Sequence, residues 1–258
     1  MTVTAAFMRR IAEVAAAETL PRFRRNGAIA NKYTEGFDPV TEADREAEQA
    51  IRRLIRAEFP GHGILGEEYG IENEASPLRW IIDPIDGTRS FISGMPLWGT
   101  LVGLTDGGEA VAGMMSQPFT GEFFFAADGR STYEGPGGGR SLSTRKTTAL
   151  SEATLCTTTP ALFSGRQREI YDDLEGRVRL ARYGTDCYAY AMLAAGNIDL
   201  VVETRLQPYD IVALIPIIEM AGGVITTWDG GPAEKGGDIV AAATPELHAA
   251  ASGILLVE

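Results

Sequence analysis

One stretch of the sequence decides how the rest is interpreted: Trp80-Ile81-Ile82-Asp83-Pro84-Ile85-Asp86-Gly87-Thr88. Its first three residues are apolar and rich in β-branched side chains, which predicts a buried strand. The carboxylates of Asp83 and Asp86 follow, and buried carboxylates are costly unless something positive lies between them. Gly87 and Thr88 offer backbone N–H groups and a hydroxyl, which suit an anion. The stretch therefore predicts a cation site beside an anion site.

The same residues also form a good turn. In Asp-Pro-x-Asp-Gly both acids can bond their own backbone, and Pro84 fixes the backbone angle while it removes one N–H donor. From these nine residues alone, the turn and the ion site are equally compatible with the sequence. The rest of the chain has to distinguish them.

Composition restricts the class of protein. The chain has 258 residues, enough for one large domain or two closely joined halves. Its 45% hydrophobic and 22% charged residues are typical of a soluble protein. The formal net charge of −12 argues against a nucleic-acid partner, because phosphate neutralisation needs the opposite sign. A small phosphorylated substrate stays possible, since a bound divalent metal reverses the local sign of a carboxylate pocket.

Cysteine usage and apolar runs give an expectation for the compartment. Cys156 and Cys187 lack metal-type spacing and are too few for a disulfide framework. No apolar run approaches the roughly 18 residues of a membrane span, and no signal-peptide core follows Arg9 and Arg10. We expect a cytoplasmic protein with no membrane partner.

Periodicity predicts helices over 4–25 and 41–59 ahead of the central stretch, the second opened by a capping box at Thr41. After Thr88, strands are predicted over 97–104, 110–116 and 122–126, followed by a Gly-rich hairpin over 128–145. Strands and helices then alternate: strands over 154–158, 180–183, 198–203, 224–227 and 239–243, helices over 167–174, 188–195, 210–221 and 246–255. A β-rich first half and an alternating second half predict packed α/β layers.

Acidic residues outside the central stretch each have an ordinary structural explanation. Asp44 falls in the first turn of a predicted helix, where a short acid stabilises the dipole. Asp210 opens a predicted helix and fits an N-cap. The adjacent Glu67 and Glu68 fit a solvated pair. For each of these residues considered alone, the ordinary structural explanation is preferred over a role in the ion site.

Four separated blocks, in order, resemble the inositol-monophosphatase-like family of magnesium-dependent phosphomonoesterases. They are Asp38-Pro39-Val40-Thr41-x-Ala43-Asp44, Gly66-Glu67-Glu68, the central stretch, and the Asp210 segment ending Ala221-Gly222-Gly223. The resemblance spans nearly the whole chain, the third block is highly specific, and four blocks in register outweigh the separate turn and cap explanations. It implies an α/β (α+β) fold, a layered αβαβα sandwich. One compact unit is expected, with most metal ligands in residues 1–150 and the remaining ligand with the specificity residues in 151–258.

The resemblance also implies a metal site. Two Mg²⁺ ions would be held, the first by Glu67, Asp83 and the Ile85 carbonyl and the second by Asp83, Asp86 and Asp210. A third, weaker ion near Glu67 and Glu68 belongs to the family picture in some members. Oxygen-only ligands suit Mg²⁺, and two ions about 3.5–4 Å apart can clamp an in-line displacement.

Catalytic roles follow from the same resemblance. Besides the ligands Glu67 and Asp83, Thr88 would orient a metal-activated water, and Asp44 would accept the Thr88 hydrogen bond. The backbone amides of Gly87 and Thr88, beside Asp86, would receive the phosphate oxygens.

Further segments resemble the histidinol-phosphate phosphatase branch: 183–190, 194–203 and 90–100. A substrate with an ammonium and an imidazole would favour acidic contacts, which Asp186 and Glu203 are expected to supply, with Arg89 and Asp210 also at the substrate. Their ordinary explanations are a helix cap for Asp186 and a solvated strand end for Glu203. In the inositol phosphatases the last metal ligand typically follows Trp, whereas here it follows Tyr209.

We therefore expect hydrolysis of L-histidinol phosphate to L-histidinol and phosphate, a step of histidine biosynthesis. The alternative is an inositol-1-monophosphatase or a broad sugar-phosphate phosphatase with the same metals. Bisphosphate and nucleotide substrates are disfavoured, because no basic cluster beyond Arg89 lies near the blocks. A catalytically idle scaffold would show a damaged ligand set, yet every matched ligand is present. Family analogy implies a homodimer, and the loop over 32–37 is expected to close over the metals.

Overall fold

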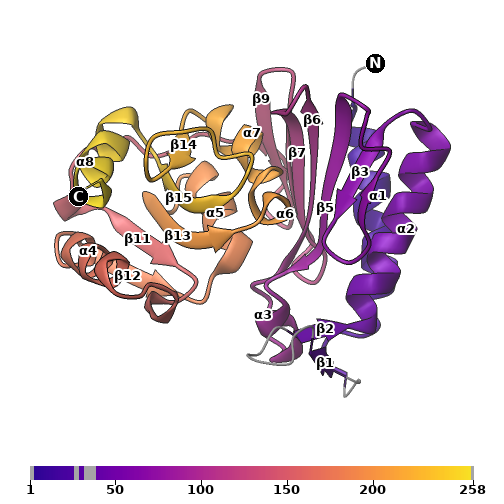
Figure 1. Ribbon diagram of the computed structural model, residues 1–258, viewed down its shortest axis with the longest axis horizontal. Coiled ribbons are helices and arrows are strands. Elements are labelled where there is room, and N and C mark those ends of the chain that lie inside the picture. The colour runs from indigo at the N-terminus through magenta and orange to yellow at the C-terminus, as the bar shows by residue number, and fades with distance from the viewer. Residues whose placement is uncertain (1–2, 26–28, 32–38, 257–258) are drawn as a thin grey trace.

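The computed structural model describes residues 3–25, 29–31 and 39–256. The loop over 32–37 therefore lies outside the described residues. Figure 1 shows two sheets side by side, with helices between them and on both outer sides. The layers run, from right to left, α1 and α2, the first sheet, α5 to α7, the second sheet, and α4 with α8. This is the predicted αβαβα sandwich.

The first sheet has eight strands in the order β10-β9-β8-β7-β6-β5-β3-β4. Their bounds are β3 Gly63–Gly66, β4 Gly70–Glu72, β5 Leu78–Asp86, β6 Gly99–Asp106, β7 Glu109–Gln117, β8 Glu122–Ala127, β9 Arg130–Glu134 and β10 Arg140–Ser141. All neighbours are antiparallel except β3 and β5, which are parallel. The predicted Gly-rich hairpin is present as β9 and β10. A short pair, β1 Ile29–Asn31 and β2 Pro39–Thr41, was not predicted.

Two helices cover the outer face of this sheet, α1 Ala5–Thr19 and α2 Glu42–Glu58. Both halves of the predicted capping box are present, since the Thr41 hydroxyl and the Asp44 carboxylate each accept from the other's backbone N–H. Helix α1 ends six residues before the predicted Arg25. Pro21 accounts for this early end, because it has no N–H to donate to the carbonyl of Ala17 four residues earlier.

The second sheet has the strand order β12-β11-β13-β15-β14. Its bounds are β11 Thr154–Thr157, β12 Leu180–Tyr183, β13 Leu200–Leu206, β14 Val224–Thr227 and β15 Gly237–Ala242. Strands β12, β11 and β13 are parallel, and β15 and β14 continue the sheet antiparallel. Helices α4 Arg166–Glu175 and α8 Pro245–Leu255 cover its outer face.

The central layer consists of α5 Asp186–Ala194, α6 Pro208–Ile211 and α7 Leu214–Glu219. The single helix predicted over 210–221 is thus divided in two. Pro216 accounts for the break, because it has no N–H to donate to the carbonyl of Val212 four residues earlier. The apolar residues between the two sheets form the largest core cluster, and smaller clusters lie under each outer helix pair.

The larger sheet lies within residues 63–141 and the smaller one within 154–242. We propose on this ground that the chain forms one compact unit of two halves that meet near residue 150. In the described ranges, no helix has the length and apolar character needed to cross a membrane.

Candidate active site

A bulge in β5 brings two of the predicted ligands to the same side of the sheet. Asp83 is paired with Leu101 of β6 and Asp86 with Gly99, so β5 has one residue more than β6 between these pairs. In a regular strand, residues three apart point to opposite faces. The extra residue cancels this alternation. Pro84 fits the irregular position because it has no N–H for the ladder, and its carbonyl accepts from the Thr100 hydroxyl at 2.8 Å.

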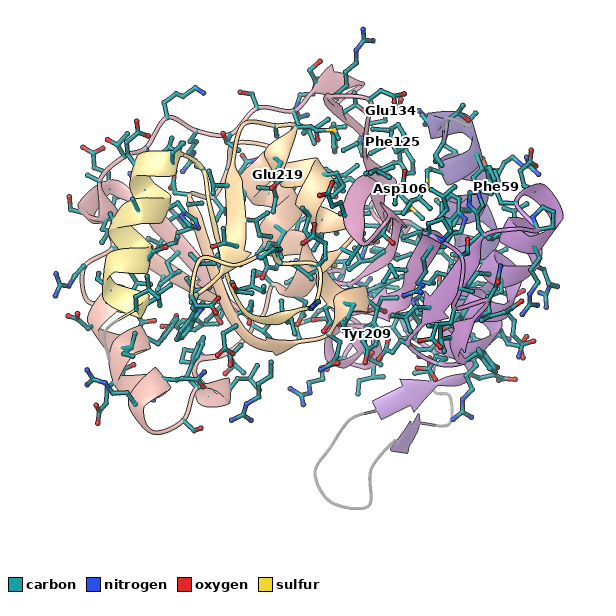
Figure 2. All side chains as sticks on the ribbon, turned by 45° about the horizontal axis from the view of Figure 1, so that its top comes forward. Phe59, Asp106, Phe125, Glu134, Tyr209 and Glu219 are labelled. Carbon is teal, nitrogen blue, oxygen red and sulfur yellow. The ribbon has the colours of Figure 1, made fainter. Side chains whose placement is uncertain are left out.

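Three carboxylates converge at this point. Asp83, Asp86 and Asp210 each offer an oxygen, and these oxygens lie within 4.8 Å of one another. Asp210 comes from α6, which packs against β5 and β6; its neighbour Tyr209 is labelled in Figure 2 beside the larger sheet. The cluster therefore joins the two halves of the chain.

A backbone N–H fixes one oxygen of each carboxylate. Asp83 Oδ1 accepts from Ile85 N at 3.0 Å, Asp86 Oδ2 from Cys187 N at 2.7 Å, and Asp210 Oδ2 from Gln207 N at 2.6 Å. Each side chain is thereby held in one orientation before any ligand arrives.

Burial and mutual repulsion make the cluster electrostatically unfavourable on its own. Burial raises the pKa of Asp83 well above its usual range, and the nearby charges of Glu67, Asp86 and Asp210 raise it further. The pKa of Asp86 is raised in the same way by burial and by Asp186 and Asp210. A divalent cation would remove this cost, and a donor set made only of oxygens suits Mg²⁺. The residues present thus fit the metal that the sequence implied.

The cluster lies in a cavity of about 160 Å³ at the junction of the two halves. The first half contributes Glu67, Asp83 and residues 85–89, and the second contributes Thr158, Asp186 and Asp210. All predicted metal ligands, together with Gly87, Thr88 and Arg89, therefore line one cavity.

The inositol monophosphatase family model matches residues 1–255. This chain belongs to that family. Its members are phosphatases that act on small phosphorylated substrates and are in general Mg²⁺-dependent. The predicted family resemblance is thereby confirmed.

Named relatives include more than one kind of phosphatase. The bifunctional phosphatase IMPL2 of Arabidopsis thaliana is 44% identical over 81% of this chain, which spans 59% of that longer protein. A histidinol-phosphatase of Chlorobaculum parvum is 37% identical over 83% of this chain and 81% of the relative. Among solved structures, an inositol monophosphatase from Zymomonas mobilis superposes with a TM-score of 0.87 at 36% identity, covering 98% of this chain and 97% of that chain. This likeness confirms the fold.

Thr88 and Asp44 are paired differently from the expectation drawn from the family. The Thr88 hydroxyl donates to the Ile85 carbonyl at 3.1 Å. Asp44 accepts instead from the backbone N–H and hydroxyl of Thr41, and it is 1% exposed. Within the described residues the expected bond from Thr88 to Asp44 is therefore replaced by three local bonds, because each side chain has an acceptor or donors three residues away.

Another part of the cavity wall is built around Asp186. Its carboxylate accepts from the Ser90 hydroxyl at 2.9 Å and the Thr158 hydroxyl at 3.3 Å. Asp186 is the first residue of α5 and has φ +42°, in the left-handed region; its two hydroxyl partners lie outside that helix, which a helix-cap role alone does not explain. Gly87 lies against it: a Cβ at position 87, where φ is +83°, would lie 3.1 Å from Asp186 Oδ2.

Glu203 does not line this cavity. It is 2% exposed, and it accepts from the Thr158 backbone N–H at 2.5 Å and from the Thr157 hydroxyl at 3.3 Å. Glu203 therefore lies behind the cavity wall, where it holds Thr158. This position is neither the expected substrate contact nor a solvated strand end.

Sequence reasoning missed the two hydroxyls of Ser90 and Thr158 and the Cys187 N–H. Thr158 had a usable signal, since it directly follows β11, one of three parallel strands. In open α/β sheets, ligands bind outside the carboxyl ends of parallel strands. The Cys187 N–H had none, because it meets Asp86 across 101 residues of sequence.

The metal-free protein is expected to lose stability as the pH rises from about 5 to about 8. Burial raises the pKa of Asp44 to about 7 and that of Glu203 to about 8. A carboxyl whose pKa is higher in the folded than in the unfolded chain stabilises the fold fully at low pH. That contribution disappears as the pH rises through the folded pKa. Thermal unfolding in EDTA across this range measures it, and a melting temperature that rises with pH would contradict it.

Proposed function

We propose that this chain is a Mg²⁺-dependent phosphomonoesterase that hydrolyses L-histidinol phosphate to L-histidinol and phosphate. The observation that carries the choice of substrate is the carboxylate of Asp186 in the same cavity as the three clustered aspartates. A cation on the substrate's leaving group would find a fixed anion there. A neutral polyol would need no such group.

The clustered acids have the role of metal ligands in this proposal. Glu67, Asp83 and the Ile85 carbonyl would hold one Mg²⁺, and Asp83, Asp86 and Asp210 a second; a third, weaker ion would lie near Glu67 and Glu68. Bound there, Mg²⁺ would neutralise the charge of the carboxylates and polarise the phosphoryl oxygens. The chain's own contribution is to fix the carboxylates through backbone N–H groups, so that little reorganisation is needed on binding.

Gly87 and Thr88 would position the phosphoryl group and the attacking water. Both residues line the cavity beside Asp86, and their backbone amides would take phosphate oxygens. Because the Thr88 hydroxyl donates to Ile85, its oxygen is oriented to accept a hydrogen bond from water. Asp44 has an indirect role, since it fixes the start of α2 behind the site.

The leaving group would be recognised from the second half of the chain. Asp186 would accept from the substrate ammonium. Burial raises the pKa of this carboxyl, and the hydrogen bonds from Ser90 and Thr158 and the charge of Arg89 oppose that rise and so favour the ionised form. Glu203 would act through Thr158, whose hydroxyl it helps to aim at Asp186. Relatives named histidinol-phosphatase from Mycobacterium tuberculosis and Streptomyces coelicolor, each 34% identical, support the same substrate.

An inositol-1-monophosphatase is the second candidate. A relative of that name from Caulobacter vibrioides is 33% identical over 74% of this chain. The proposed metal ligands would serve this reaction equally well, so only the contacts to the leaving group distinguish the two functions. A broad sugar-phosphate phosphatase would show the same metals and no preference.

Phosphate release with Mg²⁺ tests the proposal. We would compare kcat/KM for L-histidinol phosphate, inositol-1-phosphate and β-glycerophosphate, with an EDTA-treated control. A preference of about a hundredfold for histidinol phosphate, about 2.7 kcal/mol of transition-state discrimination, is expected. A higher kcat/KM for inositol-1-phosphate than for histidinol phosphate would favour the second candidate. Absence of phosphate release from every ester in the presence of Mg²⁺ would reject both functions. Light scattering after size-exclusion chromatography would test the homodimer, which we propose from family analogy alone.

A further inference from the structure

A buried ion pair in α2 lies directly behind the turn that carries Glu67. Glu48 is 0% exposed and Arg52 is 4% exposed, and Arg52 Nε lies 2.7 Å from Glu48 Oε1. Charges are rarely buried so completely unless they are paired and fully hydrogen-bonded. The function proposed above does not use either residue.

Both side chains bond to the backbone of the turn between β3 and β4. Glu48 Oε2 accepts from Glu68 N at 2.7 Å, and Glu48 Oε1 accepts from Tyr69 N at 3.2 Å. Arg52 donates to the carbonyl of Gly70. On the other side, Glu67 N donates to Ile82 O of β5 at 3.1 Å. The backbone of the turn is therefore held by a hydrogen bond at every residue from Glu67 through Gly70.

Gly66 shows how closely this pair approaches the turn. A Cβ at position 66 would lie 2.0 Å from Glu48 Oε1, so only glycine leaves room for the carboxylate. Arg52 is anchored on its far side by Glu72 of β4 at 3.2 Å, and Glu72 is also bound by Arg56. The pair is thus clamped between the helix and two strands, and it cannot shift without moving the turn.

We propose that Glu48 and Arg52 are positioning residues that hold the Glu67–Gly70 turn in the geometry needed for metal binding. The inference rests on the proposed function, because it assigns the turn's carboxylates to Mg²⁺. Neither residue of the pair lines the cavity. The effect of the pair is therefore on metal affinity, and the chemical step at saturating metal is left nearly unchanged.

Glu48→Gln is the sharpest single change. A glutamine has one carbonyl oxygen, so its NH₂ group would face an N–H donor of the turn where an acceptor is needed. It would also leave Arg52 as an uncompensated buried charge, which lowers stability as well. The double variant Glu48→Gln with Arg52→Met removes both buried charges and restores stability, but it does not restore the bonds to the turn. Glu58→Gln is the matched control, since Glu58 lies on the same helix in an exposed pair with Arg10.

Metal binding would be measured directly by titrating Mn²⁺, which takes the same oxygen ligands, and following the free ion by electron paramagnetic resonance. Melting temperature and the Mg²⁺ dependence of kcat would be recorded for the same proteins. We expect Mn²⁺ binding about tenfold weaker or more in both Glu48 variants, the range found when groups that orient metal ligands are removed. We expect kcat at saturating Mg²⁺ to change less than about threefold, and Glu58→Gln to match the wild type throughout.

The double variant separates positioning from stability. If it regains the wild-type melting temperature while Mn²⁺ binding stays weak, the pair positions the turn. If it regains both, or if folded Glu48→Gln binds Mn²⁺ as the wild type does, the pair only stabilises the fold and the inference is overturned. If the wild-type protein binds no Mn²⁺, the proposed metal function itself is overturned, and this result is separate from any result with the variants.

Discussion

Replacing Asp83 with asparagine is expected to abolish phosphate release and, in the absence of metal, to stabilise the protein. Asp83 is assigned to both proposed metal positions, so both lose a charged ligand together. Loss of Lewis-acid stabilisation worth several kcal/mol corresponds to a fall in kcat of about 1,000-fold or more. Because repulsion and burial raise the pKa of Asp83, a neutral side chain of the same shape also removes a destabilising charge.

The matched control for this change is Asp106→Asn. Asp106 ends β6, next to β5, and is exposed at the surface, where Figure 2 labels it. It should keep wild-type activity and an unchanged melting temperature, since surface charges contribute little. Phosphate release and thermal unfolding in EDTA measure both expectations. Near-normal turnover of Asp83→Asn would remove the two-metal assignment.

Replacing Asp186 with asparagine is expected to lower kcat/KM for L-histidinol phosphate by about 100-fold and to leave inositol-1-phosphate hydrolysis within about threefold of the wild type. Ser90 and Thr158 donate to different oxygens of Asp186. Asparagine keeps the length of the side chain and one of these acceptors, and its NH₂ group can donate to the other hydroxyl's oxygen. It also tolerates the left-handed backbone at φ +42° better than most residues. The change thus removes the charge with little other disturbance.

Two comparisons make this result specific. Inositol-1-phosphate serves as the internal control, because its leaving group carries no cation to lose a partner. The exposed Asp172 of α4 provides a second control, since Asp172→Asn removes one negative charge far from the cavity wall. Equal losses on both substrates for Asp186→Asn would show that Asp186 supports the site as a whole and would withdraw it from the specificity argument.

Much of the fold was predictable because its elements are determined by local patterns. The Thr41–Asp44 capping box gives the start of α2, and Pro–Gly after Phe59 ends it. Strand β12 has the predicted bounds, 180–183. Errors arose where a proline overrides periodicity, at Pro21 just after α1 and at Pro216 near the start of α7. In each case the apolar periodicity continues past the proline, although the helical hydrogen bonds of the backbone are interrupted there.

The sequence by itself determined the family, the layered fold and the set of carboxylates proposed to bind metal. Spacing and residue type suffice for these, because a short motif such as Asp83-Pro84-Ile85-Asp86-Gly87-Thr88 specifies its own local chemistry. Tertiary structure alone decided that a bulge turns Asp83 and Asp86 to one side, and that Cys187 N fixes Asp86 from the other half of the chain.

Tertiary structure also decided which acids face the cavity and which support it. Asp186 and Glu203 were equivalent in the sequence, yet one lines the cavity and the other lies behind Thr158. Glu48 occurs in a helix that otherwise resembles many amphipathic helices, and only the packing of that helix against the turn after β3 gives it a role. The physical reason is the same in each case. A side chain's partners across dozens of residues depend on how whole layers pack, and that packing is not encoded in any local pattern.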